Sequence, residues 1–480
     1  MSDFEAVIGL EVHAQLSTRT KIFCSCSTLF HSEPNTNICP VCTGLPGSLP
    51  VLNEQALRFA VAMGLALNCR INSPSYFARK HYFYPDLPKG YQISQYDVPV
   101  CSNGHLVVNT SEGSCTVRIN RIHLEEDAGK SIHDRGDATR IDMNRCGTPL
   151  IEIVSEPDIS SPAGAVAYMQ QIRQIVRYLG ICDGNMEEGS LRCDANVSIR
   201  RKGDTKLGTK TELKNMNSFR HIEKAIHFEI ERQTDILNAG GTIIQETLLW
   251  DETAEIARSM RSKEESHDSR YFPEPDLPSV VVTDQLLKKV HDTLPELPAA
   301  KKERFISACG LTEYEADILT QERRLAEYFE LAQAFCNDPK TVSNFILGEV
   351  LKTLNEQKIS IEEYPVPAEH LGYIISLIRL GTLSPTLAKS VLQFCYEEQK
   401  HPVQIIEERN LRLINDDSEI ERLVAEAIQN HPDEAQQLRE GKEKVLGFFT
   451  GRIMRAGGGK LNAKRVQEII LDTIHNNRNS

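Results

Sequence analysis

Two distant segments of the chain alternate strictly between apolar and polar residues, and this pattern constrains the fold more than any other feature. Residues 4–16 place an apolar side chain at every even position from 6 to 16, and residues 191–200 do so at every odd position from 191 to 199. Successive side chains of a β-strand point to opposite faces of its sheet. Each segment is therefore predicted to be a strand with one buried and one polar face, as in an antiparallel sheet.

The polar faces of these two strands carry acidic and basic side chains. Glu11 and His13 share the polar face of the first strand, and Asp194 lies on that of the second. Residues 210–214 continue the pattern with Glu212 and are expected to form a hairpin with the second strand. Interleaved charges of this kind either form cross-strand ion pairs on an exposed sheet or build a site for a divalent metal ion and phosphate.

Three consecutive acidic residues, Glu125, Glu126 and Asp127, occur within residues 121–130. Adjacent carboxylates repel one another unless a cation or solvent compensates their charge. Carboxylate oxygens together with an imidazole are a ligand set suited to Mg²⁺. The candidate magnesium ligands are Glu11, His13, Glu125, Glu126, Asp194 and Glu212.

Residues 79–91 form a proline-braced segment that is rich in cations and aromatic rings. Arg79, Lys80 and Lys89 supply positive charge next to tyrosine and phenylalanine side chains. Cations of this kind bind phosphate oxygens, and the rings suit a purine. The same composition is also found in a rigid surface turn, and the segment alone does not separate the two.

Four of the thirteen cysteines fall within nineteen residues, as Cys24-x-Cys26 and Cys39-x-x-Cys42. The N-terminus has neither the basic region nor the apolar core of a secretory signal, so we expect a cytoplasmic, reducing environment. Close cysteine pairs in such an environment are typical of a structural zinc site; free thiols are the alternative. The other nine cysteines are scattered and are interpreted as core or incidental residues.

Length and residue pattern predict three domains. The chain has 480 residues, which is about three times the usual domain size, and no apolar run is long enough to span a membrane. We expect a sheet-based domain over residues 1–290, a helical domain over 291–404 and a small helical tail over 405–480. The proline-rich stretch from Pro273 to Pro298 is the expected linker.

The formal net charge of −13 opposes binding to nucleic acid, so contact with a polyanion needs a local basic patch. Residues 442–480 contain eight Lys or Arg and three Asp or Glu, an excess of +5. On charge alone this stretch is more typical of a solvated helix surface. The Walker A loop, the dinucleotide fingerprint, the protein-kinase signature and the Gly/Ser-rich amidase stretch are absent, so any nucleotide is bound by a less common scheme.

Five long strings resemble one known family, the B subunits of aspartyl/glutamyl-tRNA(Asn/Gln) amidotransferases. They are IGLEVHAQL at 8–16, YPDLPKGYQISQY at 84–96, HLEEDAGK at 123–130, LRCDANVS at 191–198 and KTELKNMNS at 210–218. The resemblance runs along the whole chain, although the three glycines at 457–459 depart from the pattern. It implies an α+β fold, with an antiparallel-sheet cradle domain similar to glutamine synthetase, an all-α helical domain and a small helical tail domain.

The resemblance also implies an activity and partners. An amidase, the A subunit, would release ammonia from glutamine. The B subunit would use ATP and Mg²⁺ to phosphorylate the side-chain carboxylate of Glu or Asp mischarged on tRNA, and ammonia would displace the phosphate to give Gln-tRNA or Asn-tRNA. The implied partners are the amidase (A) and small (C) subunits of the amidotransferase, and mischarged Glu-tRNA(Gln) or Asp-tRNA(Asn), with no membrane.

The roles implied for individual residues follow the matching strings. Direct binding of Mg²⁺ is expected of His13, Glu125 and Glu126, and direct or water-mediated binding of Glu11, Asp194 and Glu212, with Glu152 as a further member. The expected phosphate and acyl-carboxylate clamps are Arg79, Lys80, Lys89 and Arg192, and structural zinc is expected at Cys24, Cys26, Cys39 and Cys42. The tail residues expected to bind tRNA are Arg452, Arg455, Lys460, Lys464 and Arg465.

Two other functions remain open from the sequence. One is a noncatalytic tRNA-binding adaptor whose carboxylates hold a structural cation. The other is a stand-alone carboxylate–amine ligase acting on a small molecule, which is disfavoured because the helical and basic tail domains would then have no purpose. ATP consumption that depends on mischarged tRNA separates the enzyme from the adaptor.

Overall fold

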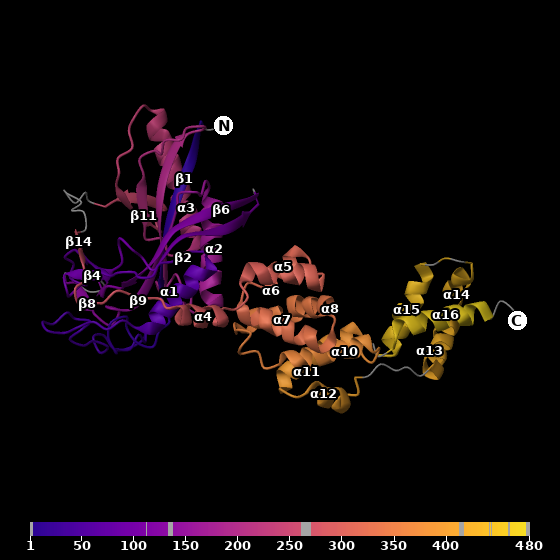
Figure 1. The fold of residues 1–480 in the computed structure, drawn as a ribbon. Coiled ribbons are helices and arrows are strands. Elements are labelled where there is room, and N and C mark those ends of the chain that lie inside the picture. Colours follow the sequence, from indigo (N-terminus) through magenta and orange to yellow (C-terminus); the bar gives the residue numbers. More distant parts are fainter. Residues whose placement is uncertain are drawn as a thin grey trace. The chain divides into compact units, whose positions relative to one another are not determined.

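The computed structural model describes residues 3–111, 113–132, 138–260, 270–411, 417–440, 442, 444–458 and 461–476. The chain divides into two compact units, Met1–Pro298 and Ala299–Ser480. The first unit is built on β-sheets with packed helices, and the described part of the second is helical (Figure 1). The chain is therefore an α+β protein with a large, mainly antiparallel sheet.

The main sheet of the first unit has nine strands, all antiparallel to their neighbours except β11 and β12. In spatial order the strands are β13 (Ile256–Ser259), β12 (Thr247–Asp251), β11 (Thr211–Lys214), β10 (Leu191–Arg201), β1 (Phe4–Gln15), β9 (Pro149–Ser155), β6 (Gly113–Glu126), β5 (Cys101–Thr110) and β2 (Arg70–Ile71). The two alternating segments are thus the adjacent central strands β1 and β10. The expected hairpin partner of the second segment is confirmed, because β11 pairs antiparallel with β10.

Strand β1 has the two faces that its sequence predicts. Leu10 and Val12 are fully buried, whereas Glu11 and His13 are half-buried on the other face. The same alternation holds on β10, where Ala195 is fully buried. Apolar side chains on one face drive packing against helices, and the polar face stays available for chemistry.

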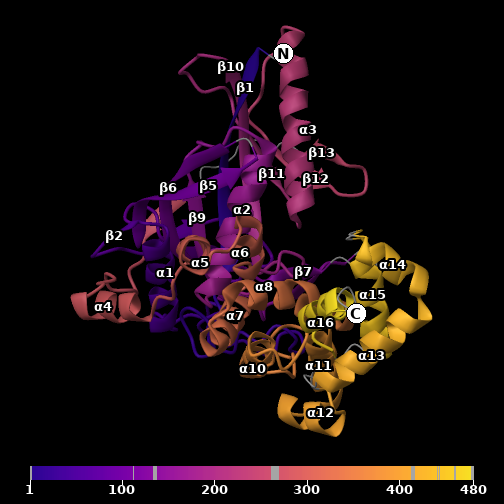
Figure 2. The same ribbon diagram turned by 90° about the vertical axis from the view of Figure 1, so that its right-hand side faces the viewer.

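Three helices cover the apolar face of the main sheet (Figures 1 and 2). They are α1 (Glu54–Ala66), α2 (Pro162–Tyr178) and α3 (Phe219–Asn238). Helix α1 packs on β5 and β6, α2 on β5 and β1, and α3 on β10 and β13. Ser161 and Ser218 begin α2 and α3 by accepting backbone hydrogen bonds through their side chains, which satisfies donors that a helix start leaves open.

A second, three-stranded sheet packs on β6 through its strand β4. Its order is β14 (Arg270–Pro273), β3 (Ala78–His81) and β4 (Tyr91–Ser94), and β7 (Lys130–Ile132) and β8 (Arg140–Asp142) form a separate two-stranded ribbon. The Ile93 amide of β4 donates to the Glu126 side chain at the end of β6. The small sheet thereby reaches the polar part of the main sheet.

The prediction that Pro273–Pro298 is a linker is wrong. Within this stretch, β14 pairs with β3, and Val280 exchanges backbone hydrogen bonds with Ser75. The helix α4 (Asp284–Thr293) then packs against α1. Proline is compatible with an edge strand because it lacks only one donor, and the buried Val282 anchors the stretch to the core of the first unit.

The second unit consists of short helices around two separate buried clusters, one within residues 305–406 and the other within 420–474. The helices are α5 (Pro298–Cys309), α6 (Glu313–Leu319), α7 (Arg323–Cys336), α8 (Pro339–Phe345), α9 (Leu351–Gln357), α10 (Ala368–Arg379), α11 (Pro385–Glu398), α12 (Pro402–Glu408), α13 (Asp417–Asn430), α14 (Pro432–Arg439), α15 (Lys444–Ala456) and α16 (Ala463–Asn476), with the π-helical turn η1 (Ile346–Val350) between α8 and α9. Domain boundaries at 290 and 404 stay predictions. Among the described residues, no helix is both long and apolar enough to cross a membrane.

Candidate active site

The polar face of the main sheet gathers side chains from five adjacent strands, β11, β10, β1, β9 and β6. The register places His13 opposite Arg192 on one side and opposite Glu152 on the other, and it places Glu152 opposite His123. Residues that are directly paired across strands and share a face lie close enough for their side chains to interact. One row across four strands therefore carries two imidazoles, a carboxylate and a guanidinium.

The first cluster of candidate metal ligands is His13, Glu125 and Glu152, whose ligand atoms all lie within 4.8 Å of one another. His13 Nε2 is 3.6 Å from Glu125 Oε1 and 3.5 Å from Glu152 Oε2. His123 Nε2 supports the cluster at 3.1 Å from Glu152 Oε2, and the Ser94 hydroxyl donates to Glu125 over 3.3 Å. Two carboxylates and an imidazole at this separation are a fitting donor set for a divalent cation.

The protonation of this cluster follows from its burial and its partners. Burial opposes a charge on His123, but hydrogen bonds to Glu125 and Glu152 outweigh it and raise the pKa of His123 to about 9. The pKa of His13 is raised for the same reason, chiefly by Glu152. Burial opposes ionisation of Glu152, yet the two imidazoles hold its pKa well below its usual range. Because a metal binds neutral imidazole, His13 must release a proton when it becomes a ligand.

The second cluster is Glu11, Asp194 and Glu212, again with ligand atoms within 4.8 Å of one another. Lys214 Nζ lies 3.0 Å from Asp194 and 3.1 Å from Glu212, and the Asn196 amide donates to Glu11 over 2.9 Å. Burial and the neighbouring carboxylates raise the pKa of Glu11. Three carboxylates beside one ammonium leave excess negative charge, which a divalent cation would offset.

Cations flank the two clusters. Arg192 Nη2 lies 3.0 Å from Asp127 Oδ2, which also accepts a hydrogen bond of 2.8 Å from the side-chain amide of Gln15. Burial opposes ionisation of Asp127, but Arg192 and Arg145 lower its pKa, so this group keeps the Arg192 guanidinium in place beside His13. In the described part of the chain, Lys80 has no carboxylate within ion-pair distance, and its ammonium lies 5.9 Å from the Tyr82 ring centre.

The structure does not bring Glu126 to the first cluster, although it follows Glu125 in the sequence. Consecutive residues of a strand point to opposite faces, and Glu126 forms a buried ion pair with Lys89 instead. Its carboxylate also accepts a hydrogen bond of 2.9 Å from the Ile93 amide. Glu152, rather than Glu126, lies with His13 and Glu125.

Arg79 also lies in a different setting from the one its clamp role requires. Its guanidinium donates to Glu274 over 2.8 Å and to Asp276 over 2.9 Å, and it lies 4.4 Å from the ring centre of Tyr91. These bonds join β3 to the stretch that follows β14. We interpret Arg79 as a structural tie rather than as a free clamp.

The four cysteines of the predicted zinc site converge. The sulfurs of Cys24, Cys26, Cys39 and Cys42 all lie within 4.8 Å of one another, a closed donor set that fits tetrahedral zinc. A hydrogen bond from the Cys24 thiol, the Cys39 amide and the charge of Lys21 lower the pKa of Cys42 despite burial. A sulfur that is readily ionised is suited to metal binding.

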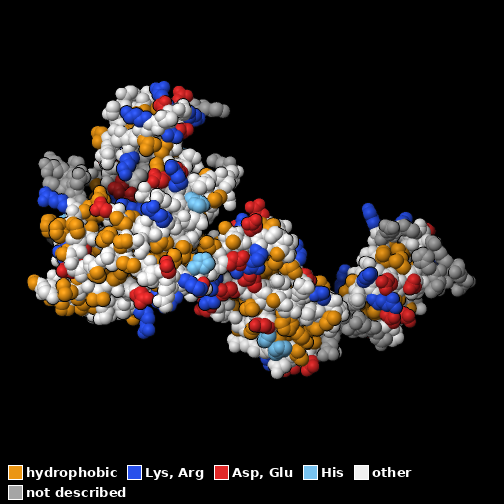
Figure 3. Space-filling view, viewed as in Figure 1, with side chains coloured by type: hydrophobic (Ala, Val, Ile, Leu, Met, Phe, Trp, Pro, Cys, Tyr) orange, Lys and Arg blue, Asp and Glu red, His pale blue; other side chains and the backbone are white. Residues whose placement is uncertain are grey.

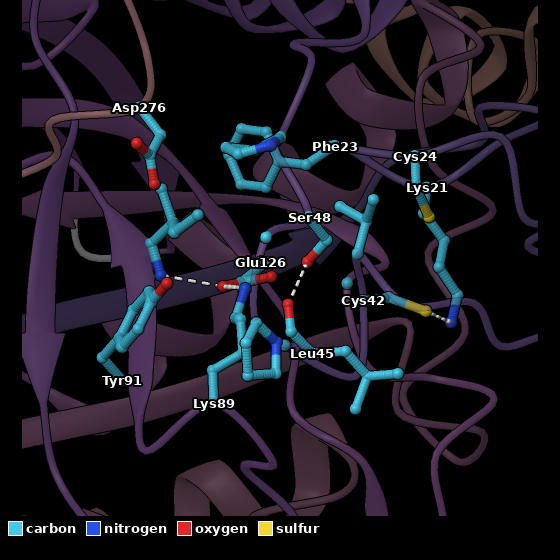
Figure 4. A pocket seen from close by; sticks show the side chains of 17 residues that line it. Lys21, Phe23, Cys24, Cys42, Leu45, Ser48, Lys89, Tyr91, Glu126 and Asp276 are labelled. Carbon is cyan, nitrogen blue, oxygen red and sulfur yellow. Dashed lines mark hydrogen bonds and ion pairs between the residues drawn. The ribbon is translucent and has the colours of Figure 1, made fainter.

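A cavity of about 200 Å³ connects this loop to the Lys89–Glu126 pair (Figure 4). Lys21, Cys24 and Cys42 lie on one side of it, Glu126 lies near the middle, and Tyr91 and Asp276 lie on the opposite side. The cavity has walls from both the cysteine loop and the small sheet. This cavity could not be predicted from the sequence, because the residues that line it come from separate segments.

The basic residues of the tail differ in their availability. Arg465 forms ion pairs with Asp417 at 2.6 Å and with Glu468 at 2.9 Å, and Arg452 lies 5.1 Å from the ring centre of Phe448. The side chains of Arg455 and Lys464 are exposed, whereas Lys460 lies outside the described residues. The predicted RNA-binding roles are untested by these contacts.

Several residues of the site were given no role from the sequence, namely His123, Asp127, Gln15, Asn196 and Lys214. The signal that could have found them is alternation. His123 and Asp127 are spaced two residues on either side of Glu125, and Lys214 follows Glu212 by two. The residues that pair with them across the sheet can be identified only when the register of the strands is known.

Comparison with known families matches both parts of the chain. A GatB/GatE catalytic domain model matches residues 6–288, and a GatB domain model matches residues 327–474. The fold and the site therefore define a protein with a sheet-based catalytic domain followed by a helical region.

Relatives that are similar in sequence cover nearly the whole chain. The aspartyl/glutamyl-tRNA(Asn/Gln) amidotransferase B subunit of Chlorobium phaeobacteroides is 52% identical over 467 residues, which are 97% of this chain and 98% of that protein. The B subunits of Persephonella marina and Thermodesulfovibrio yellowstonii are 49% and 52% identical over 98% of this chain, and over 100% and 99% of their own lengths. The chain belongs to the family of aspartyl/glutamyl-tRNA(Asn/Gln) amidotransferase B subunits, as its sequence motifs predicted.

Proposed function

We propose that this chain is the part of an ATP- and Mg²⁺-dependent aminoacyl-tRNA amidotransferase that activates and amidates the substrate carboxylate. The substrates are Glu-tRNA(Gln), Asp-tRNA(Asn) or both. The sheet unit is the catalytic cradle, of a kind similar to glutamine synthetase, and the helical region with its basic tail holds the tRNA. The single observation that carries the proposal is the convergence of His13, Glu125 and Glu152 on the polar face of the main sheet, in a chain of this family.

The proposed reaction has two steps, transfer of a phosphoryl group and then amidation. A carboxylate is a poor electrophile, so the terminal phosphoryl group of ATP is first transferred to a carboxylate oxygen and ADP leaves. Ammonia then forms a bond to the acyl carbon, the carbon–oxygen bond to phosphate breaks, and the nitrogen loses a proton. The product is the side-chain amide, Gln or Asn, still esterified to tRNA.

The residues of the two carboxylate clusters fit divalent cations in both number and chemistry. We assign His13, Glu125 and Glu152 to one ion, and Glu11, Asp194 and Glu212 to another, directly or through water. Bound Mg²⁺ would offset the charge of the phosphates and orient their oxygens. The ligands hold those ions on a rigid sheet rather than on loops, which favours accurate positioning.

The transfer brings two anions together, so nearby positive charge must offset their repulsion. Arg192 is held beside His13 by Asp127, and Lys80 is without a carboxylate partner among the residues described here. We assign these two residues to phosphate or substrate-carboxylate binding. Lys89, already paired with buried Glu126, is assigned to positioning within the cavity.

A separate polypeptide must supply the ammonia, because no amidase motif is present in the sequence. The relatives are named as B subunits, and we assign this chain to a complex with an amidase, the A subunit, and a small C subunit.

Hydrophobic side chains gather on one face of the first unit (Figure 3). Leu29, between the two cysteine pairs, and Val51, nine residues after Cys42, are each 73% exposed, and exposed apolar patches mark protein interfaces. We propose the cytoplasm as the location of the complex.

The four-cysteine cluster is assigned to structural zinc. Four sulfurs leave no position for water, so the ion would stabilise the loop rather than take part in the reaction. The segment that follows Cys42 packs closely on Lys89, because a side chain at Gly44 would overlap the Lys89 side chain. The zinc loop is therefore packed directly against the Lys89–Glu126 pair.

The experiment that tests the proposal is transamidation by the reconstituted three-protein complex, with Glu-tRNA(Gln) and Asp-tRNA(Asn) offered separately. Glu125→Gln with Glu152→Gln should abolish ATP-dependent amidation while complex assembly and glutamine hydrolysis persist. Amidation that survives would remove the metal assignment. If mischarged tRNA elicits no ATP consumption, that result would instead support the adaptor function.

A further inference from the structure

Lys21 lies on the side of the cavity next to the four cysteines, and its environment is unusual for a lysine. Its side chain is fully buried, with 0% exposed. Its ammonium lies 3.5 Å from Cys42 Sγ and 3.4 Å from the Met143 carbonyl oxygen, and Figure 4 shows the side chain reaching toward Cys42. Lysine is among the residues least often buried unless it is paired.

The charge of Lys21 therefore needs a partner. No carboxylate lies within ion-pair distance of it in the part of the chain that the structure describes, and Glu126, which lines the same cavity, is engaged by Lys89. Burying an ammonium without a counter-charge is costly. The remaining anionic candidates are the cysteine sulfurs, which become thiolates when they bind a metal ion.

We propose that Lys21 is the built-in counter-charge of the four-cysteine metal site. Zinc bound by four thiolates carries a net charge of about −2, and the Lys21 ammonium on Cys42 Sγ compensates part of it. The cation and the metal then stabilise each other: the loaded site makes the buried lysine favourable, and the lysine disfavours protonation and loss of the thiolates. This role rests on the proposed zinc, not on the amidation reaction.

The backbone places Lys21 for this role. Its amide donates to the Cys26 carbonyl over 2.9 Å, and the following amide, of Ile22, donates to Gly147 over 2.9 Å. A Cβ at Gly147 would lie 3.4 Å from both Cys42 Cβ and Lys21 Cδ. The ammonium is thus directed at the cluster by bonds that do not involve the lysine side chain, so a neutral replacement of similar length would keep the local geometry.

The test is Lys21→Met in the full-length chain, with Lys206→Met, at an exposed position, as the matched control. We expect the zinc of the loaded Lys21 variant to pass to a colorimetric chelator at least about tenfold faster than that of wild type, as for other residues that support metal ligands. The control should match wild type. Release from the Lys21 variant at the wild-type rate would overturn the proposal.

A second readout separates a counter-charge from a packing role. Thermal unfolding is followed with zinc bound and after zinc has been stripped. Lys21→Met should destabilise the loaded protein but leave the stripped protein at least as stable as stripped wild type, because the lysine is a liability without thiolates. Equal destabilisation of both forms would show a packing role and overturn the proposal.

A third measurement uses wild type alone, in case the variant does not fold. Acetic anhydride labelling with mass spectrometry should modify Lys21 only after zinc is removed, and equal protection in both forms would contradict the coupling. Wild-type protein that neither contains nor takes up zinc would overturn the metal site and the role of Lys21 together. Transamidation is not a readout in any of these measurements.

Discussion

His13 and Glu152 face each other across the antiparallel pair of β1 and β9, with His13 Nε2 3.5 Å from Glu152 Oε2. They lie far apart in the sequence, yet the register of two central strands joins them. His123 approaches the same Glu152 oxygen from β6, at 3.1 Å. Glu152 is thus the carboxylate shared by both imidazoles.

Glu152→Gln should lower the affinity for Mg²⁺ by about tenfold or more, because the amide keeps the shape but removes an anionic ligand. ATP-dependent transamidation should fall with it and recover partly at high Mg²⁺. Titration of Mg²⁺ by calorimetry measures the affinity. Glu188→Gln, at an exposed position, is the control. Unchanged Mg²⁺ affinity in the Glu152 variant would place the ion elsewhere.

Binding of Mg²⁺ should release protons and tighten as pH rises. The pKa of His13 in the metal-free protein is raised above its ordinary value, since hydrogen bonding and attraction to Glu152 outweigh burial. A protonated imidazole cannot ligate, so the affinity for Mg²⁺ rises as pH passes upward through that raised pKa. Calorimetry in buffers of different ionisation enthalpy counts the protons. Binding without proton release would exclude His13 as a ligand.

Metal-free protein should lose stability as pH rises from about 6.5 through about 9. The folded-state pKa of His123 is about 9 and that of an unfolded histidine is about 6.5. A raised folded-state pKa contributes stability that is complete below the lower value and lost above the higher one. The only tryptophan, Trp250, is buried in the first unit, so its fluorescence reports urea unfolding there. His123→Asn should flatten this part of the pH profile.

Glu126→Gln should destabilise the first unit by about 3 kcal/mol or more, because it leaves the Lys89 ammonium buried without its carboxylate. The side chains are only 6% and 2% exposed, respectively for Lys89 and Glu126. Lys89→Met combined with Glu126→Gln should recover much of the loss, since no unpaired charge then remains. Urea unfolding monitored at Trp250 measures all three proteins. Additive losses would contradict coupling between the two residues.

Replacing Arg452, Arg455 and Lys464 together by Gln should weaken the binding of tRNA whatever its nucleotide sequence, and should reduce the dependence of binding on salt. Each lost phosphate contact lowers the slope of log affinity against log salt by about 0.7 to 0.9. Filter binding over a range of salt concentrations gives the slope. Arg465→Gln should have a smaller effect on binding, because its guanidinium is engaged by Asp417 and Glu468. An unchanged slope in the triple variant would leave the tail without an electrostatic role.

Local patterns predicted some parts of this protein well. The alternation in residues 4–16 gives the two faces of β1 because the side-chain period of a strand is two. Cys24, Cys26, Cys39 and Cys42 converge as their spacing predicted. Each of these features depends on neighbours within a few residues or a short loop.

In two other places the structure differs from what the sequence suggested, because contacts between distant residues decide the arrangement there. The prolines from 273 to 298 indicated a linker, but pairing of β14 with β3 and burial of Val282 place this stretch in the first unit. Adjacency in the sequence grouped Glu126 with Glu125 as a metal ligand. The pleat of β6 turns Glu125 toward His13 and Glu126 toward Lys89.

The sequence by itself determined the family, the strand faces and the kinds of side chain available for metal, phosphate and thiol chemistry. These follow from residue identity and from periods of two or 3.6 residues, which a single segment contains. Only the tertiary structure decided which carboxylates lie together. The strand register places Glu152 next to His13, and the alternation of side chains along β6 directs Glu126 toward Lys89 instead. Register and cross-strand contact are set by the packing of the whole sheet, and no local segment encodes them alone.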